Sequence, residues 1–510
     1  MKAEATNLHS QPKANSGPWW AAIAAITLLG FATRLVGLRD SPAGDELIFH
    51  WYVDGRSFSS MWSLVVNHEK TPPLGFILGW LTAHIGSPAT WMRLPALLAG
   101  TATIPLVGLL GRRCAKARTG LVAAALVATS PFMMFYGIEA RAYGLAACLS
   151  SASLLLLLSA SDKGGKMRWA AWALVTALAL LSHYTVVFVI LASVAWALAS
   201  QRRLLKPVLL AGVGVLLLVS WWIPSFVTQW GHSGSEARRI GNLAPLAVST
   251  LSNITTRALV GHPLWSSLQT TPTSTIPGTP ALAMILAGIA IALLAGVITW
   301  LRSDPRSLRL RPETVLLAMC AVATPIGLVL LSLEPGKTLL LPRNLICSLP
   351  ATAALLAVPV AKLKRPLSLL CTLLIAGGLL IGSVRELTNY SRPNMRAAAN
   401  AIESRWTPGD SILEAIYFNE QPLDQDLLIH LGAAQRERLE LSSKVALRPF
   451  DAPRPAGASI FTVAPIYGYT IEALGPRPEQ AKGWKLVWQQ RWPGLPPVVA
   501  AQWRRVPAGR

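Results

Sequence analysis

Two neighbouring acids, Asp45 and Glu46, stand just beyond the first long apolar segment of the chain. Acids are scarce in this protein, since Asp and Glu together number 24 in 510 residues. A carboxylate placed where a membrane helix has surfaced can take the proton of an acceptor hydroxyl as a general base. Partial burial and the second acid would raise the pKa of Asp45 and make it a stronger base. The competing interpretation is a solvated pair, or a helix N-terminus at which carboxylates offset the dipole.

A second polar cluster, HEKTPPLG, contains His68, Glu69 and Lys70. The ammonium of Lys70 is a compact charge that suits a phosphate, although an interfacial lysine also extends toward water for its own solvation. His68 and Glu69 could serve a metal, but one His beside one Glu is a weak indication of a metal site. We therefore assign no metal ligand and no cofactor, and a requirement for a divalent metal stays open.

Three further polar groups interrupt apolar segments. The turn FYGIEARAYG contains Glu139, Arg141 and Tyr143. It holds either an ion pair within the turn or an arginine that faces the same cavity as the acids and binds an anion. Arg343, in LLLPRNLICSLP, could equally bind an anion or simply extend toward water. His183 and Tyr184, in SHYT, are interpreted as a satisfied interfacial pair.

The composition predicts a polytopic α-helical membrane protein. It is 52% hydrophobic and 14% charged, whereas soluble domains carry about 25% charged residues. About eleven segments satisfy the length of roughly 20 residues that a transmembrane helix needs. They lie near 19–37, 91–111, 119–137, 142–160, 168–182, 184–200, 207–227, 280–301, 313–332, 344–361 and 366–383. We expect the first to be a retained helix rather than a removed signal peptide.

The basic residues indicate orientation rather than nucleic-acid binding. The net charge is +22, but Lys and Arg cluster in short loops between apolar segments, as membrane orientation requires. Alternate loops hold Arg112, Arg113, Lys116 and Arg118; Lys163, Lys166 and Arg168; Arg202, Arg203 and Lys206; Arg302, Arg306, Arg309 and Arg311; and Lys362, Lys364 and Arg365. We expect these loops and the N-terminus in the cytoplasm. The five cysteines lie in or beside apolar segments without a CxxC pair, which argues against a disulfide framework or a zinc site.

The opposite face would carry the rest of the polar chain. The first outer loop, 38–90, contains apolar residues at helical spacing in SFSSMWSLVVNH, which predicts an interfacial helix. The following PPLGFILGWLTAHIG is expected to be a second, partly embedded or interfacial helix. The loop 228–279 could be a lid, a binding loop or disordered. The tail, 384–510, is predicted to be a small extracytoplasmic α/β domain beside a transmembrane domain, 1–383. Its helix is expected within 392–406 and its strands at 411–418, 458–465, 485–492 and 498–506.

A series of segments resembles a known family. RLVGLRDSPAGDELIFHWYV, KTPPLGFILGW, RLPALLAG, YGIEARAYGL, SHYTVVFVI and LLLPRNLICSLP, in that order, are similar to glycosyltransferase family 39 and related GT-C membrane enzymes. These include bacterial aminoarabinose transferases and protein O-mannosyltransferases. The resemblance covers roughly 19–383 and the helix and first strand of the tail. The acid pair after the first helix and the Lys-Pro-Pro-Leu-like segment are its most specific parts.

The resemblance implies inverting sugar transfer from a polyprenyl-phosphate donor at the extracytoplasmic face of a bacterial inner or plasma membrane. Asp45 would be the general base and Glu46 its neighbour in the same pocket. Lys70, Arg141 and Arg343 would bind the donor phosphate. This chain departs from the family in two places: it has PRN where many relatives have PRY, and Thr71 separates Lys70 from the two prolines.

The leading hypothesis is therefore a polyprenyl-phosphate-dependent glycosyltransferase. Further residues predicted to line its substrate cavity are His68, Glu69, Glu139, Tyr143, His183 and Tyr184. Its expected partners are the lipid-linked sugar, the bilayer and an acceptor that is a lipid, a glycan or a protein, but no nucleic acid. A transporter or lipid flippase is the alternative, although most spans lack the central charges that transport uses. A membrane scaffold acting through its tail is a third hypothesis.

Overall fold

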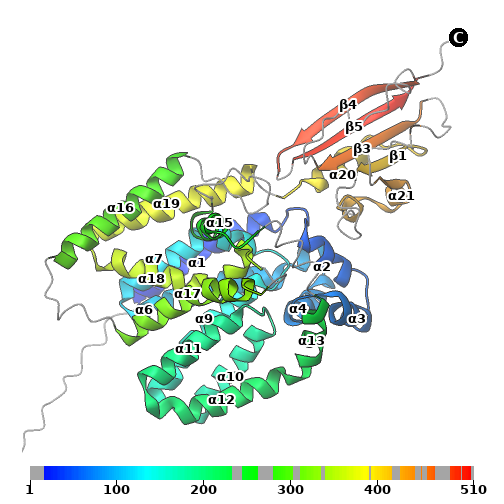
Figure 1. Ribbon diagram of the computed structural model, residues 1–510. Coiled ribbons are helices and arrows are strands. Elements are labelled where there is room, and N and C mark those ends of the chain that lie inside the picture. The colour runs from blue at the N-terminus through cyan, green and yellow to red at the C-terminus, as the bar shows by residue number, and fades with distance from the viewer. Residues whose placement is uncertain are drawn as a thin grey trace, which may run out of the picture.

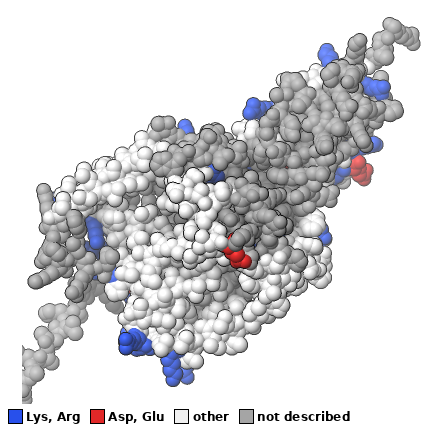
Figure 2. All heavy atoms as spheres, viewed as in Figure 1, with Lys and Arg blue, Asp and Glu red and all other residues white. Residues whose placement is uncertain are grey.

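The structure is a computed structural model in which most of the chain is helical and a small sheet lies at the C-terminal end (Figure 1). It describes residues 17–232, 244–261, 279–301, 311–334, 339–389, 392–415, 426–442, 450, 457–465, 483–494 and 497–506. Much of the visible surface over the helices carries no charged side chain (Figure 2). Such a surface is what lipid-facing helices require, because a charge in hydrocarbon is costly.

All eleven predicted membrane segments coincide with helices. Seven helical segments in the described part of the chain are long and apolar enough to cross a membrane. They comprise α1 (Gly17–Gly37), α5 with α6 (Pro88–Trp91 and Leu94–Cys114), α9 (Tyr143–Lys163), α12 with its flanking turns (Leu205–Val219), α16 (Thr279–Leu301), α17 (Pro312–Ser332) and α19 (Arg365–Asn389). The other four contain shorter helices: α7 (Ala117–Thr129), α10 (Lys166–Leu180), α11 (Val186–Ser200) and α18 (Leu349–Lys362). The polytopic helical fold is thus confirmed.

The charge inside the first span has a structural partner. Arg34 of α1 is fully buried and lies beside the break between α7 and α8 (Pro131–Tyr136). Pro131 has no N–H, so the Val127 carbonyl four residues earlier cannot receive its helical hydrogen bond. Arg34 Nη2 lies 3.4 Å from that oxygen and 3.2 Å from the Met133 carbonyl oxygen. This arginine therefore completes a broken helix.

The first outer loop folds into three short helices, α2 (Asp45–Val53), α3 (Phe58–His68) and α4 (Leu74–Ala83). The predicted helix at SFSSMWSLVVNH is confirmed as α3. Its apolar stripe, however, packs on protein: Met61 and Val65 are fully buried in a cluster with residues of α2 and α4. The rings of Phe49 and Phe76 stack within that cluster at 4.7 Å. Helix α2 is thereby anchored against its neighbours.

The tail forms the predicted helix and strands. Helix α20 (Met395–Glu403) packs its apolar face into the core of a five-stranded sheet. The strands are β1 (Ser411–Ala415), β2 (Leu439–Ser442), β3 (Ser459–Pro465), β4 (Trp484–Trp492) and β5 (Val498–Arg505), in the order β2-β1-β3-β5-β4. β1 runs parallel to β2 and β3, and β5 runs antiparallel to β3 and β4. β2 was not predicted, and α19 continues past the predicted domain boundary to Asn389.

The long outer loop is partly described. It contains α13 (Ile223–His232), which starts before the predicted loop, and α15 (Val248–Val260). α15 packs against α8 and against η4 (Pro342–Leu345), the short helix that carries Arg343. Residues 233–243 and 262–278 of the predicted 228–279 loop lie outside the described residues.

Candidate active site

Asp45 is the first residue of α2 and forms an ion pair with Arg343. Gly44, immediately before it, has a φ of 55°, a left-handed conformation that glycine adopts without strain. Asp45 Oδ2 lies 2.9 Å from Arg343 Nη1, and the two side chains are 26% and 33% exposed, respectively. The structure thus places a partly accessible carboxylate and a partly accessible guanidinium in direct contact.

The pKa of Asp45 shifts in the direction opposite to the prediction. Burial alone would raise the pKa of this carboxyl, but Arg343 and then Arg141 outweigh burial and hold it below its ordinary value. The expected rise was based on partial burial and the second acid and took no account of these two arginines. Asp45 is consequently ionised at neutral pH and able to accept a proton.

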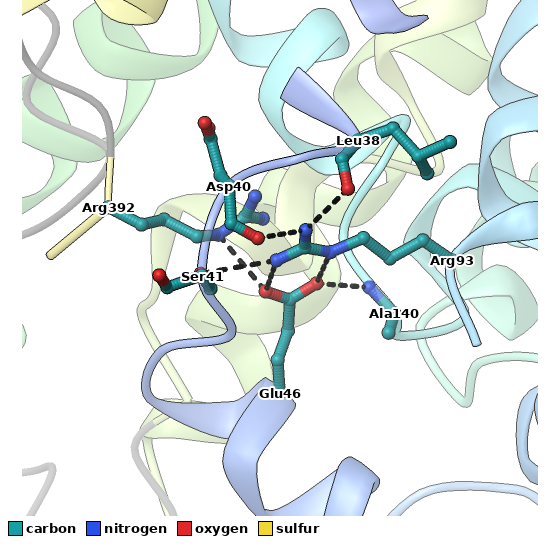
Figure 3. A network of polar contacts seen from close by, with 7 residues as sticks. All are labelled: Leu38, Asp40, Ser41, Glu46, Arg93, Ala140 and Arg392. Atoms are coloured by element: carbon teal, nitrogen blue, oxygen red, sulfur yellow. Dashed lines mark hydrogen bonds and ion pairs between the residues drawn. The ribbon is translucent and has the colours of Figure 1, made fainter. Parts of the chain in front are cut away.

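Glu46 faces a different environment from Asp45, since successive helix residues point about 100° apart. Its side chain is fully buried between Arg93 and Arg392 (Figure 3). Arg93 donates from Nε to Oε1 at 2.8 Å and from Nη2 to Oε2 at 2.6 Å. Arg392 Nε lies 3.1 Å from Oε2, and the Ala140 N–H donates to Oε1 at 2.7 Å. Burial raises the pKa of Glu46, but Arg392 and Arg93 more than reverse that effect.

Arg93 and Arg392 were not predicted as site residues. Arg93 directly precedes α6, where the positive end of the helix dipole disfavours a cation. This unfavourable position at a helix N-terminus could have indicated that Arg93 needs an acidic partner. Arg392 gave no such signal, because nothing in the sequence connects it with Glu46. The same two arginines act on Asp40: burial raises the pKa of this carboxyl, and Arg392 and Arg93 oppose the rise.

Arg141 pairs with Glu69 rather than with Glu139 of its own turn. The pair is bidentate, with Nη1 to Oε2 and Nη2 to Oε1 both at 3.1 Å. Glu69 Oε1 also accepts the backbone N–H of Lys70 at 2.9 Å and the hydroxyl of Thr71 at 3.1 Å. Thr71 therefore helps to fix Glu69. The side chains of Lys70 and of His68, the last residue of α3, are exposed.

Glu139 is a buried carboxyl close to this group of charges. Burial raises its pKa to about 8; Arg392 opposes the shift, and Glu46 and Asp45 add to it. Its Oε2 has no hydrogen-bond partner among the described residues. Because this pKa lies above neutrality, Glu139 is mainly protonated at pH 7 and can donate a hydrogen bond.

Two aromatic neighbours border the charged residues. The ring of Tyr143 lies 5.4 Å from that of His183. Burial, together with Arg141 and Arg343, lowers the pKa of His183 to about 3, so the imidazole is neutral. Its Nδ1 accepts the Thr185 N–H at 3.3 Å, which places the ring proton on Nε2. Tyr184 donates to Gln229 at 2.6 Å and accepts from Trp222 at 2.9 Å, as expected of a satisfied residue.

A metal-binding cluster is not found among the residues that the structure describes. No three His, Cys, Asp or Glu side chains of these residues gather in a way that could hold an ion. The acid that suggested a metal, Glu69, is instead engaged by Arg141. The described site is thus a set of acids and arginines without an assigned metal ligand.

Comparison with known proteins identifies the fold. The family model of dolichyl-phosphate-mannose-protein mannosyltransferases matches residues 70–223. The crystal structure of ArnT from Cupriavidus metallidurans bound to undecaprenyl phosphate is similar over 96% of this chain and 98% of that chain, with 14% identity and a TM-score of 0.52. The archaeal oligosaccharyltransferase AglB from Archaeoglobus fulgidus, in complex with an inhibitory peptide and a dolichol-phosphate, is similar over 94% and 74%, with 13% identity and a TM-score of 0.50. No curated protein sequence matches the chain.

These similarities define an integral membrane protein with the GT-C fold. The chain therefore shares its fold with ArnT and AglB, and residues 70–223 resemble dolichyl-phosphate-mannose-protein mannosyltransferases.

Proposed function

We propose that the protein transfers a sugar from a polyprenyl-phosphate donor to an acceptor hydroxyl, with inversion at the anomeric carbon. The observation that carries this proposal is the contact between Asp45 and Arg343, because it joins a candidate base to a candidate phosphate ligand. The donor class is supported by the ArnT and AglB structures, which hold undecaprenyl phosphate and a dolichol-phosphate. The acceptor is a lipid, a glycan or a protein.

The donor phosphate and Asp45 compete for the same guanidinium. When the phosphate binds Arg343, Asp45 loses the cation that most depresses its pKa. Its basicity then rises at the moment when the sugar is in place. The ion pair thus keeps the base weak until the donor arrives.

In the transfer step the acceptor O–H proton passes to Asp45 and the acceptor oxygen attacks the anomeric carbon. The bond between that carbon and the phosphate oxygen breaks, and its electron pair stays on the phosphate. Arg343, Arg141 and Lys70 stabilise the negative charge that develops there. Glu46 has a positioning role and takes no proton in this step, because both of its carboxylate oxygens already accept hydrogen bonds.

Glu139 and the surrounding side chains would shape the substrate cavity. A protonated Glu139 can donate a hydrogen bond to the sugar or to the departing phosphate. Tyr143 and His183 would border the sugar, while Tyr184, His68 and Glu69 support the surrounding loops. Glu69 would hold Arg141 in place, and the bidentate contact between the two side chains supports this role.

We place the reaction on the extracytoplasmic side of a bacterial inner or plasma membrane. The basic loops would then be cytoplasmic by the positive-inside rule. The acids of the first outer loop and the C-terminal sheet would lie on the opposite side. A donor whose lipid tail stays in the bilayer would present its phosphate at that interface.

The test is the substitution Asp45→Asn in purified protein reconstituted into proteoliposomes. The amide keeps the shape of the side chain but cannot take up the acceptor proton, so transfer should fall by about 10²-fold to 10⁴-fold. Donor and product are followed by mass spectrometry across a panel of polyprenyl-phosphate sugars. Asp54→Asn is the matched control, because Asp54 caps the other end of α2 and its side chain is 51% exposed. Full activity of a folded Asp45→Asn protein would refute the role of Asp45.

A further inference from the structure

Two polar contacts between described residues join the C-terminal region to the loop that carries Asp45. Arg392 Nε lies 3.1 Å from Glu46 Oε2, and these side chains are 2% and 0% exposed. The backbone N–H of Arg396, in the first turn of α20, donates to Ser41 Oγ at 3.0 Å. Figure 3 shows Arg392 approaching Glu46 from the side opposite to Arg93. Two segments far apart in the sequence thus share one buried carboxylate.

The loop before Asp45 depends on such tertiary contacts. Gly44, the N-cap of α2, offers no side-chain cap, so local support for the first turn comes from backbone hydrogen bonds such as that from the Leu47 N–H to the Gly44 carbonyl at 3.0 Å. Arg93 holds the preceding backbone by donating to the carbonyl oxygens of Leu38 at 3.0 Å, Asp40 at 2.5 Å and Ser41 at 3.3 Å. These contacts fix the loop from the membrane domain. Arg392 and Arg396 fix it from the C-terminal region.

The direction of the Arg392 side chain is itself determined. Its guanidinium lies over the ring of Phe135, 4.6 Å from the centroid, and the residue is only 3% exposed. The same cation acts electrostatically on Asp40 and Glu139 as well as on Glu46. Arg392 is therefore a fixed charge among acids of the first outer loop and of the turn before α9.

Arg93 and Arg392 differ in what their removal would leave behind. Without Arg93, Glu46 would lose a bidentate partner. The carbonyl oxygens of the loop would lose the guanidinium that donates to them, and the combined change would be strongly destabilising. Without Arg392, Glu46 would keep the paired charge of Arg93 and the Ala140 hydrogen bond. Loss of Arg392 therefore removes a connection between two parts of the protein without leaving the carboxylate unpaired.

We infer that Arg392 is a positioning residue through which the C-terminal region sets the placement of Asp45. It acts on Glu46, and Asp45 is the adjacent residue in the same helical turn. Docking of the C-terminal region onto residues 38–46 is thereby a requirement for efficient transfer. This inference rests on the proposed function, since it assumes that Asp45 is the base.

The test compares Arg392→Gln and Arg392→Lys with wild type in the proteoliposome assay. A misplaced base slows the chemical step, and a displacement of about 1 Å can cost about 10²-fold. We expect kcat of Arg392→Gln to fall by about tenfold to 10²-fold while KM for the donor changes less than about twofold. Arg392→Lys keeps the positive charge and should recover a large part of kcat. Arg405→Gln is the matched control, because Arg405 is an exposed arginine just after α20 whose guanidinium lies over Trp488 of β4.

The outcomes separate the inference from the proposed function. If wild type and Arg405→Gln transfer no sugar, the proposed function fails. If wild type transfers sugar and Arg392→Gln matches its kcat, the positioning role is refuted and the function stands. The role would also be refuted if Arg392→Gln and Arg392→Lys lost the same amount of kcat and if their thermal unfolding midpoints fell by the same amount. Arg392 would then have a structural role only.

Discussion

Asp45 shows how one contact governs a candidate base. Its position in an acid-poor chain points to chemistry, but its acid strength is set by Arg343 at 2.9 Å. The arginine keeps the carboxylate ionised and at the same time limits its basicity. A donor phosphate that takes over the guanidinium would remove that limit. In the proposed mechanism the pair therefore links donor binding to base strength.

This link predicts a change in the pH dependence of the reaction. The pKa of Asp45 is depressed by Arg343, so the wild-type carboxylate stays ionised as the pH falls toward the acid range. In Arg343→Gln the pKa of Asp45 rises, and the acid limb of kcat/KM should move to higher pH by roughly one unit. KM for the donor should also rise, because a phosphate ligand is lost.

The measurement is kcat/KM between about pH 4 and pH 8 with a fixed donor and acceptor. Arg203→Gln serves as the control, because Arg203 is exposed and lies in one of the basic loops. An acid limb that stays in place in Arg343→Gln would show that Arg343 does not control the ionisation that the reaction needs.

The turn between α8 and α9 contributes several residues to the site. It supplies the Ala140 N–H to Glu46, the buried carboxyl of Glu139, and Arg141. The turn is seated directly on α6: a Cβ at Gly100 would lie 2.6 Å from the carbonyl oxygen of Gly137. The glycine at position 100 therefore permits the close approach on which the turn depends.

We expect Gly100→Ala to destabilise the protein by about 1–3 kcal/mol, because the methyl group meets backbone and not a flexible side chain. The thermal unfolding midpoint in detergent should fall, and transfer should fall with it because Arg141 and Glu139 shift. Gly212→Ala in α12 is the control, since a Cβ at that position meets no atom of the described part of the chain within 4 Å. Equal midpoints for the two variants would contradict this account of the turn.

Hydropathy predicted the helices well, but it could not predict what covers each face. The stripe on α3 has the spacing of an interfacial helix, yet Met61 and Val65 pack against α2 and α4. Periodicity reports that a face is apolar and leaves its partner unspecified. The four-residue strand β2 escaped prediction because so short a segment has little pattern of its own.

The site was predictable only where residues cluster along the chain. Asp45, Glu69 and Arg141 stand in short polar interruptions of apolar sequence, and the structure gives them charged partners. The partners themselves come from distant segments. Glu46 meets Arg93 and Arg392 through tertiary folding, which a single sequence does not reveal.

Several of the predicted basic loops meet in the folded protein. Arg113 pairs with Asp162 and lies 3.5 Å from Glu313. Arg118 donates to the Leu363 carbonyl at 3.1 Å, and Arg311 donates to the Ala115 carbonyl at 3.1 Å. Four of the five loops that alternate along the sequence are thus neighbours at one end of the helices. This arrangement supports the assignment of these loops to one side of the membrane.

Cysteine labelling tests which side that is. Four of the five native cysteines are buried and Cys148 is partly buried, so background reaction with a bulky, impermeant maleimide should be low. We expect Ser404→Cys, exposed after α20, to be labelled in intact right-side-out vesicles. Lys166→Cys, exposed at the start of α10, should be labelled only after the membrane is permeabilised. The reverse pattern would put Asp45 on the cytoplasmic side. Labelling of both sites before permeabilisation would contradict the alternation of loops from which the orientation is inferred.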